Sequence, residues 1–368
     1  MRILVCPDSF GGTLSASAAA DAIVAGWSST KPDSEFILVP LSDGGPGFLE
    51  TVHAAIGGEY ISASVQGAFG EEREVVWLRK AERAYVEVAQ VCGIENSKKD
   101  GTAAMSASSF GVGQLLLEIA NDKSISIVSI GLGGTSVSDA GAGMLAALGA
   151  SANVDLSKGV SDLAHIENFE WNQSLNVLSN LKIEFLTDVD VPLTGKRGAG
   201  LGFSMQKGAS AEVAAEIDEI HQLFSAKLGR AADGKNHAVT LGAGSAGGIG
   251  YALFWLGAER FPGITKVIEL TGLAELTQKV QLVISGEGRL DWQSEVGKVM
   301  TGVADLARSN GLPLLALVGQ NDLSLRECQN LGVHGVYAMA DYFGFESSLD
   351  HPAETLCKLA ARAARTWG

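Results

Sequence analysis

The sequence is poor in cysteine, and its few cysteines are scattered. Cys6, Cys92, Cys328 and Cys357 stand far apart in the 368-residue chain and form no Cys-x-x-Cys pair. Closely spaced cysteines are the usual mark of a disulfide framework or of a structural zinc site. Cys6 and Cys92 lie in apolar stretches, where a cysteine packs as a small core residue. We therefore expect neither disulfides nor a cysteine-bound metal.

Positive charge is also scarce. The chain carries 27 Lys and Arg residues against 42 Asp and Glu residues, which gives a formal net charge of −15. Proteins that bind nucleic acid need basic patches that neutralise phosphates. The composition therefore argues against a nucleic-acid partner, although a local basic pocket can still bind a small anion.

Long hydrophobic runs are missing as well. No apolar stretch reaches the roughly 18 residues of a membrane-spanning helix without a charge or a loop signal. The apolar run at residues 1–6 ends at Pro7-Asp8 after the length of a strand, which is unlike a signal peptide. We expect a cytoplasmic protein with no membrane partner.

Glycine, in contrast, is abundant. The chain has 46 glycines among its 368 residues, well above the usual share of about 7%. They gather in short clusters after apolar runs, where a bare backbone can approach a ligand closely. The chain is also longer than one typical core supports, so two domains are expected.

Apolar, β-branched runs alternate with helical patterns. Expected strands at residues 2–6 and 36–41 lead into polar glycine turns and then helices, which is typical of a parallel sheet. Residues 61–88 instead suggest an antiparallel meander. The sequence predicts an α/β protein of two α/β domains, in which residues 1–60 plus 290–368 form a flavodoxin- or Rossmann-like parallel-sheet domain. Residues 61–289 form the second, inserted α/β domain, and the active site lies in the interdomain cleft.

The densest group of polar side chains follows the apolar run at residues 280–284. Its members are Glu287, Arg289, Asp291, Gln293, Ser294 and Lys298. They fall beyond the carboxyl end of an expected strand, where ligands bind in open α/β sheets. Gathering charges of both signs is costly unless they meet a ligand. The alternative is a charged loop that merely follows a strand.

Acidic residues stand near glycine at the ends of five expected strands. They are Asp8, Asp43, Asp139, Asp188 with Asp190, and Glu287 with Asp291. Two glycine-rich loops, residues 131–143 and 242–250, lead into helices whose N-terminal N–H groups can bind phosphate. Neither loop is a Walker A motif. For the loop at residues 242–250 the alternative is that its glycines allow tight packing of a helix on a sheet.

Carboxylates beside phosphate-binding loops suit phosphoryl transfer. That reaction needs Mg²⁺ held by acidic oxygens, cations along the transferred phosphate, and a carboxylate that orients the attacking hydroxyl. Asp188 and Asp190 can serve as metal ligands and base. The cations that can offset the phosphate charge are Arg197, Lys207, Arg289 and Lys298. Asp139, just ahead of a helix, has helix capping as its alternative role, and we expect the six histidines to be surface or packing residues.

Taken together, these motifs resemble the bacterial glycerate kinase family of two-domain α/β enzymes over nearly the whole chain. The matching pieces are Pro7-Asp8-Ser9-Phe10, Asp43-Gly44-Gly45, Gly131-Leu132-Gly133-Gly134 with Asp139 and Gly141-Ala142-Gly143, Asp188-Val189-Asp190 with Pro192-Leu193, Gln206-Lys207-Gly208, Gly242-Ala243-Gly244 with Gly247-Gly248, and Gly286-Glu287-Gly288-Arg289-Leu290-Asp291 through Gly297-Lys298.

The resemblance implies ATP-dependent phosphorylation of a hydroxyl of glycerate, to a 2- or 3-phospho product, with Mg²⁺. Within it we predict catalytic roles for Asp188, Asp190, Arg289 and Asp291, the first two also as metal ligands. Cofactor contacts are predicted at Gly133, Gly134, Lys207, Gly244, Gly247 and Lys298. Substrate contacts are predicted at Asp8, Ser9, Asp43, Arg197 and Glu287. The expected partners are glycerate and ATP, and a homodimer is compatible with the sequence.

Three positions depart from the family pattern. Gly11 stands where the family usually has Lys, Pro46 where it has Glu, and Val191 where it has Asn. The first two changes remove one cation and one anion, and we hypothesise that they compensate each other. The alternatives are a kinase for a related small hydroxy acid and a catalytically silent ligand-binding homologue. A Rossmann-type dehydrogenase is disfavoured because the first strand leads into Pro7-Asp8-Ser9 rather than a glycine fingerprint.

Overall fold

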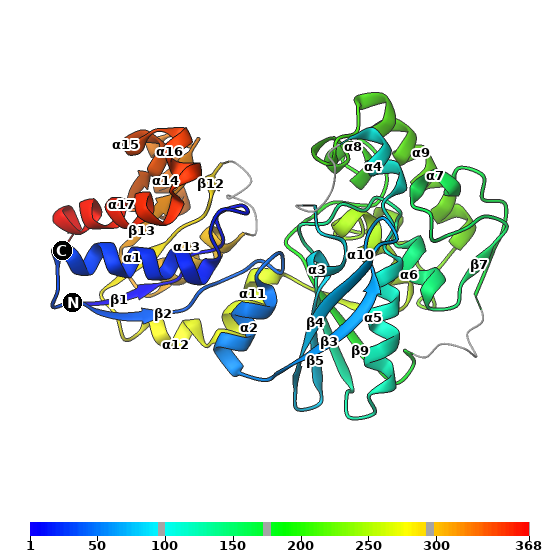
Figure 1. Cartoon of the computed structure of the whole chain (residues 1–368), viewed down its shortest axis with the longest axis horizontal. Helices are drawn as coiled ribbons and strands as arrows, with labels where there is room; N and C mark the ends of the chain where they lie inside the picture. Colours follow the sequence, from blue (N-terminus) through cyan, green and yellow to red (C-terminus); the bar gives the residue numbers. More distant parts are fainter. Residues whose placement is uncertain (95–99, 172–177, 292–297, 368) are drawn as a thin grey trace. The chain divides into compact units, whose positions relative to one another are not determined.

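A computed structural model describes residues 1–94, 100–171, 178–291 and 298–367, and these form two compact units. Unit 1 consists of Met1–Asp43, Glu50–Gly57 and Pro262–Gly368, and unit 2 of Gly44–Leu49 and Gly58–Phe261. The two units appear in Figure 1 with their elements labelled. Helix α2 (Phe48–Ile56) contributes residues to both.

Unit 1 is built on a five-stranded sheet with the order β15-β13-β11-β1-β2. The strands are β1 (Arg2–Val5), β2 (Glu35–Leu38), β11 (Leu282–Ser285), β13 (Leu314–Val318) and β15 (Gly335–Ala338). All four neighbouring pairs are parallel. Numbered by their sequence within this sheet, the strands follow the flavodoxin-like order 2-1-3-4-5. The order reverses between β1 and β11, and the flavodoxin-like prediction describes this unit correctly.

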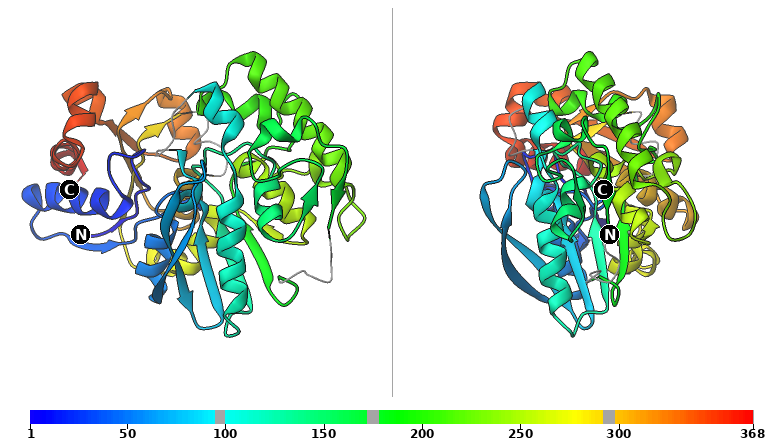
Figure 2. Two further views of the ribbon diagram at one scale, coloured as in Figure 1. Left: turned by 45° about the vertical axis from the view of Figure 1, so that its right-hand side comes forward. Right: turned by 90° about the vertical axis from the view of Figure 1, so that its right-hand side faces the viewer.

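Helices cover both faces of this sheet. They are α1 (Ala16–Thr30), α11 (Gly263–Thr271), α12 (Leu273–Thr277), α13 (Val299–Ser309), α14 (Leu325–Leu331), α15 (Met339–Phe343), α16 (Phe345–Asp350) and α17 (Pro352–Trp367). Consecutive strand residues such as Ile3 and Leu4, which point to opposite faces, are both fully buried, as expected for a parallel sheet with both faces covered. Helices α1 and α17 pack together on one face, and the chain termini lie near each other in every view (Figures 1 and 2).

Unit 2 contains a six-stranded mixed sheet with the order β10-β9-β6-β5-β4-β3. The strands are β3 (Glu59–Gln66), β4 (Glu72–Lys80), β5 (Arg83–Glu87), β6 (Ile127–Gly131), β9 (Lys182–Leu186) and β10 (Glu259–Phe261). Strands β3, β4 and β5 pair antiparallel, which confirms the predicted meander. The pairs from β5 through β6 and β9 to β10 are parallel.

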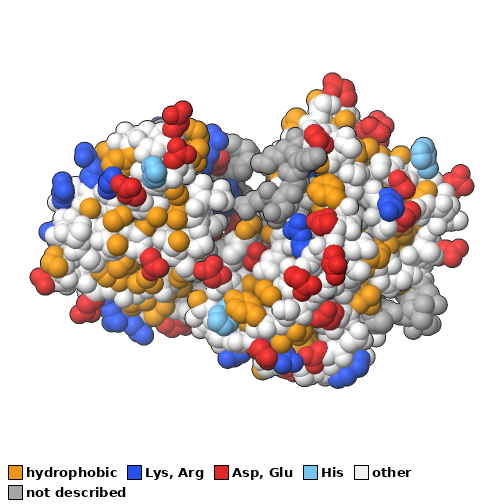
Figure 3. All heavy atoms as spheres, viewed as in Figure 1, with side chains coloured by type: hydrophobic (Ala, Val, Ile, Leu, Met, Phe, Trp, Pro, Cys, Tyr) orange, Lys and Arg blue, Asp and Glu red, His pale blue; other side chains and the backbone are white. Residues whose placement is uncertain are grey.

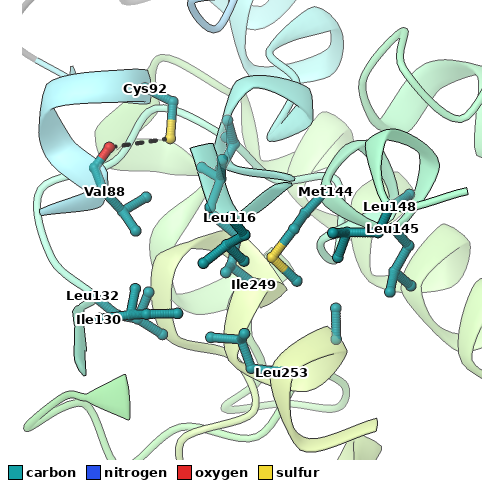
Figure 4. Packing of buried hydrophobic residues seen from close by; sticks show 14 of the residues in the cluster. Val88, Cys92, Leu116, Ile130, Leu132, Met144, Leu145, Leu148, Ile249 and Leu253 are labelled. Atoms are coloured by element: carbon teal, nitrogen blue, oxygen red, sulfur yellow. Dashed lines mark hydrogen bonds between the residues drawn. The ribbon is translucent and has the colours of Figure 1, made fainter. Parts of the chain in front are cut away.

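The remaining elements of unit 2 surround this sheet. The helices are α3 (Val88–Cys92), α4 (Gly101–Ser106), α5 (Phe110–Asn121), α6 (Ala142–Ala147), α7 (Val160–Leu163), α8 (Ala199–Phe203), α9 (Ala211–Leu228) and α10 (Ile249–Trp255), with 3-10 turns η3 (Met205–Lys207), η4 (His237–Val239) and η5 (Ser245–Gly248). Strands β7 (Ser151–Ala152) and β8 (Phe169–Glu170) form a small hairpin. Figure 4 shows Leu116, Met144 and Ile249 meeting in the core from α5, α6 and α10.

One stretch of unit 2, Gly101–Asn121, is long and apolar enough to cross a membrane by length and composition alone, with a mean hydropathy of 1.2. It is not one straight helix, because residues 107–109 separate α4 from α5. Leu115, Leu116 and Ile119 of α5 are buried in the core of unit 2. The stretch therefore serves as a core element of this unit.

The second boundary between the units differs from the predicted one. Residues 61–289 were predicted to form the inserted domain, whereas unit 1 resumes at Pro262. The reason is strand β11, which pairs with both β1 and β13 and so occupies the centre of the unit 1 sheet. Its sequence reads as a buried strand but does not specify which of the two sheets it joins.

Candidate active site

The carboxyl ends of the unit 1 strands surround a cavity of about 330 Å³, which we call the unit 1 pocket. Each strand contributes one lining segment, with Asp8 after β1, Asp43 after β2, Glu287 after β11, Gln320 after β13 and Met339 after β15. The pocket therefore lies where the strand order reverses between β1 and β11. Open α/β sheets bind their ligands at such a switch point.

Two carboxylates of the unit 1 pocket, Asp43 and Glu287, act on a third, Asp8. The pKa of Asp8 is well above its ordinary value, first because of burial and then because of the negative charge of Asp43, with a smaller effect of Glu287. The backbone N–H of Ser9 donates to Asp8 Oδ1 at 2.6 Å and opposes this rise. The cluster therefore favours a proton, a cation or a hydroxyl donor in the pocket.

Cations line the same pocket. Arg289 lies on the short strand β12 (Arg289–Leu290), which pairs in parallel with β14 (Gln320–Asn321). Asp322 accepts hydrogen bonds from Arg289 Nε at 2.7 Å and from Nη2, and so orients the guanidinium. Lys298, which also lines the pocket, is the N-cap residue of α13. This arrangement can bind a carboxylate, because arginine presents several donors in a fixed plane.

A second cavity, the unit 2 pocket, has a volume of about 240 Å³ and is lined by both predicted glycine-rich loops. Gly133 and Gly134 follow β6, and Gly244 and Gly247 lie at the turn η5. Glycine is also required by packing, because a Cβ on Gly247 would lie 1.8 Å from the carbonyl oxygen of Val137. Both interpretations, a ligand-binding loop and a tightly packed one, are therefore compatible, because the same loops pack closely and line a pocket.

Lys207 supplies positive charge to the unit 2 pocket. Its side chain is only 4% exposed, and Nζ donates to the carbonyl oxygen of Val137 and to Ser138 Oγ at 3.4 Å. Burial lowers the pKa of Lys207 to about 8, partly opposed by Cys92 and Asp139. An ammonium group beside glycine loops is a suitable partner for phosphate oxygens.

Asp139 supports the unit 2 pocket without lining it. Its buried carboxylate accepts hydrogen bonds from Ser109 N and Oγ, both at 2.8 Å, and from the N–H groups of Gly141 and Gly143. These bonds join the starts of α5 and α6, which confirms the capping alternative. Desolvation raises the pKa of Asp139, and the hydrogen bonds oppose that rise.

Comparison with known proteins identifies the family of the chain. The model of the glycerate kinase family matches residues 3–368. The chain belongs to the glycerate kinase family. A glycerate kinase of Halalkalibacterium halodurans is 31% identical, covering 99% of this chain and 96% of its own length. The glycerate 2-kinase of Escherichia coli K12 is 32% identical, covering 100% and 98%.

A solved structure supports the same relationship. A crystal structure from Salmonella typhimurium LT2, assigned as glycerate kinase 2, matches with a TM-score of 0.76 and 30% identity. The match covers 100% of this chain and 98% of that chain. The α/β fold and the recognition of the glycerate kinase family from sequence motifs are thus confirmed.

Most of the predicted site residues line one or the other of the two pockets. The unit 1 pocket is lined by Asp8, Ser9, Asp43, Glu287, Arg289, Asp291 and Lys298. The unit 2 pocket is lined by Gly133, Gly134, Lys207, Gly244 and Gly247. Lys298, grouped with the cofactor residues in the sequence analysis, therefore lies with the predicted substrate residues. Gln293, Ser294 and Gly297 lie outside the described residues.

Three predicted residues line neither of these pockets, within the part of the chain that the structure describes. Asp190 is exposed and accepts a hydrogen bond from Arg260 Nη2 at 2.5 Å, which joins the ends of β9 and β10. Arg197 is exposed on the loop before α8. Asp188 is half-buried beside Val189, and Val189 lines the unit 2 pocket. Of the three, Asp188 stays a candidate for the site.

Several lining residues of the unit 1 pocket were not predicted from the sequence. Gln320, which lines the pocket, and Asp322, which binds the lining residue Arg289, follow β13 just as the acidic residues follow other strands, so the same pattern could have found them. Phe345 and Leu349 on α16 also line the pocket, but apolar residues on a short helix give no functional signal. Gly11 lines the pocket with φ +49°, and no atom lies within 4 Å of an added Cβ.

Proposed function

We propose that this chain transfers the γ-phosphoryl group of ATP to a hydroxyl of glycerate, and that glycerate binds in the unit 1 pocket. In the reaction a bond forms between the hydroxyl oxygen and Pγ, the bond between Pγ and the bridging oxygen breaks, the hydroxyl proton leaves, and ADP is released. The observation that carries the proposal is a switch-point pocket with carboxylates and an oriented arginine, in a member of the glycerate kinase family.

Arg289 and Lys298 bind the carboxylate of glycerate in this proposal, because both cations line the pocket. The acids Asp8, Asp43 and Glu287 accept hydrogen bonds from the hydroxyl groups. Asp8 takes the proton of the attacking hydroxyl, since its raised pKa makes it a better base than an ordinary aspartate. Asp190 is a weaker candidate for that role because Arg260 already binds it.

The unit 2 pocket is the proposed binding site for the phosphates of ATP. Backbone N–H groups of the glycine-rich loops and the ammonium group of Lys207 would meet the phosphate oxygens. These contacts neutralise charge that would otherwise oppose the approach of a nucleophile.

Mg²⁺ fits this proposal as an ion that the nucleotide brings. Among the described residues, no three His, Cys, Asp or Glu side chains gather closely enough to hold a metal. Mg²⁺ bound to a nucleotide commonly takes only one or two carboxylates from the protein, the other ligands being phosphate and water oxygens. Asp188, beside the unit 2 pocket, is the proposed protein ligand, and the ion would neutralise charge on the phosphates.

The test is a coupled assay of ADP release with Mg-ATP and D-glycerate. We expect glycerate-dependent turnover that Asp8→Asn lowers by about 10²-fold or more, the range expected for general-base catalysis. Asp341→Asn, an exposed residue outside the pocket lining, is the matched control. ATP binding without turnover on glycerate would instead identify a silent homologue or a kinase of another hydroxy acid. Phosphorus NMR of the product distinguishes 2-phosphoglycerate from 3-phosphoglycerate.

A further inference from the structure

The unit 1 pocket has an apolar wall that a three-carbon, polar acid would leave uncovered. Phe345, Ser348 and Leu349 of α16 line the cavity, and their i, i+3, i+4 spacing places them on one face of the helix. Phe345 is 51% exposed and Leu349 is 48% exposed. The buried side chains of Phe10 and Met339 line the same cavity.

The cavity is also larger than glycerate requires. Its volume of about 330 Å³ falls at the lower end of the roughly 300–1,000 Å³ of pockets that hold drug-sized ligands. At Gly11, which lines it, an added Cβ would have no atom within 4 Å. The charged residues at the strand ends and the apolar face of α16 therefore leave room for a ligand that has both an acid group and an apolar group.

We propose that this pocket also takes 2,3-dihydroxy acids with an alkyl substituent beyond the hydroxyl groups, and that Phe345 and Leu349 determine this specificity. The inference rests on the proposed function. The acid group meets Arg289 and Lys298, while the alkyl group covers the half-exposed side chains of α16 and removes apolar surface from water. The chemistry is unchanged: the hydroxyl oxygen attacks Pγ and gives its proton to Asp8, the bond between Pγ and the bridging oxygen breaks, and ADP leaves.

The experiment uses two acids of the same length and configuration, 2,3-dihydroxypentanoate and 2,3,4-trihydroxybutanoate. They differ by a terminal methyl in place of a hydroxyl. Binding of each acid is measured by calorimetry, and kcat/KM is measured with Mg-ATP. We expect the full-length protein to prefer the pentanoate roughly fourfold, the factor given by burial of one methyl-sized group.

Variants of the wall assign the preference to α16. Phe345→Ser and Leu349→Ser should each bring the ratio between the two acids close to one. Leu325→Ser, at a side chain that is 74% exposed and does not line the pocket, should keep the ratio. All three positions are solvent-exposed to a large degree, so the variants are expected to fold.

Two results would overturn the inference. The first is equal affinity of the wild-type protein for the two acids. The second is an unchanged ratio in the α16 variants together with a raised KM for ATP, which would place the adenine ring on this wall. Failure of the proposed function can be told apart from failure of this inference. Absence of turnover on glycerate would refute the proposed function, whereas the ratio of the two binding affinities, measured without turnover, would still test the inference.

Discussion

At the scale of single residues, burial of the Asp8 carboxyl group in the unit 1 pocket lowers stability at neutral pH. Its pKa is raised above the ordinary 3.8 by burial and by Asp43. Because the folded state binds this proton more tightly, stability falls as pH rises from about 3.8 through the raised pKa. Active sites commonly sacrifice stability in this way.

Asp8→Asn should therefore be more stable than the wild-type protein at pH 7 to 8, and no more stable near pH 4. Thermal unfolding of both proteins across this pH range measures the difference. The same substitution should lower activity, as described above. A variant that is less stable at neutral pH would contradict the view that the buried Asp8 carboxylate destabilises the folded protein.

Lys207 gives a pH dependence of opposite sign. Its pKa is lowered from 10.5 to about 8 by burial, so between these values the unfolded chain binds more protons than the folded one. Stability should then rise with pH from about 8 to about 10.5. Lys207→Met should remove this rise, whereas Lys227→Met, at an exposed position of α9, should keep it. Denaturant titrations at several pH values measure the slope, and an unchanged slope in Lys207→Met would refute the assignment.

At the scale of helices, close packing of α1 on α17 depends on one glycine. A Cβ on Gly26 would lie 1.9 Å from the backbone carbonyl oxygen of Cys357, so the two helices must separate. We expect Gly26→Ala to destabilise the protein by about 1–3 kcal/mol, the usual cost of overpacking. Gly202→Ala in α8 is the matched control, because nothing lies within 4 Å of its added Cβ. Urea denaturation of both variants tests this, and equal effects would contradict the described packing.

Asp139 holds the starts of α5 and α6 together by hydrogen bonds. Asp139→Ala leaves buried donors at Ser109, Gly141 and Gly143 without their acceptor. Each unsatisfied donor costs about 1–3 kcal/mol, so the three backbone donors together should cost at least about 3 kcal/mol. Asp21→Ala, at an exposed position of α1, should change stability by less than about 0.5 kcal/mol. A small effect of Asp139→Ala in urea denaturation would show that water replaces the carboxylate.

At the scale of the whole molecule, the sequence predicted the types of element and the charged residues that line the two pockets. Strand ends followed by glycine and an acid are local signals, and in unit 1 they converge because parallel strands share one carboxyl edge. Membership of a sheet is not local, so the place of β11 was wrong. Hydrogen-bond partners can also depend on which strands become neighbours. Arg260 binds Asp190 because β10 pairs with β9, and no spacing in the sequence predicts that pairing.

The charge of the molecule agrees with a small-molecule site. Acidic side chains are spread over the face drawn in Figure 3, with Lys and Arg side chains between them, and the formal net charge is −15. An anionic substrate is therefore attracted by local cations rather than by the overall field. The cations that line the pockets are Arg289 and Lys298 in unit 1 and Lys207 in unit 2.

The central claim is that glycerate binds in the unit 1 pocket and the phosphates of ATP in the unit 2 pocket. Steady-state kinetics of Arg289→Ala and Lys207→Met test it most directly. Arg289→Ala should raise KM for glycerate by at least tenfold with little change in KM for ATP, and Lys207→Met should do the reverse. Arg326→Ala and Lys227→Met, both at exposed positions outside the pockets, are the controls. The opposite pattern, with Arg289→Ala raising only KM for ATP, would contradict the assignment of the two pockets.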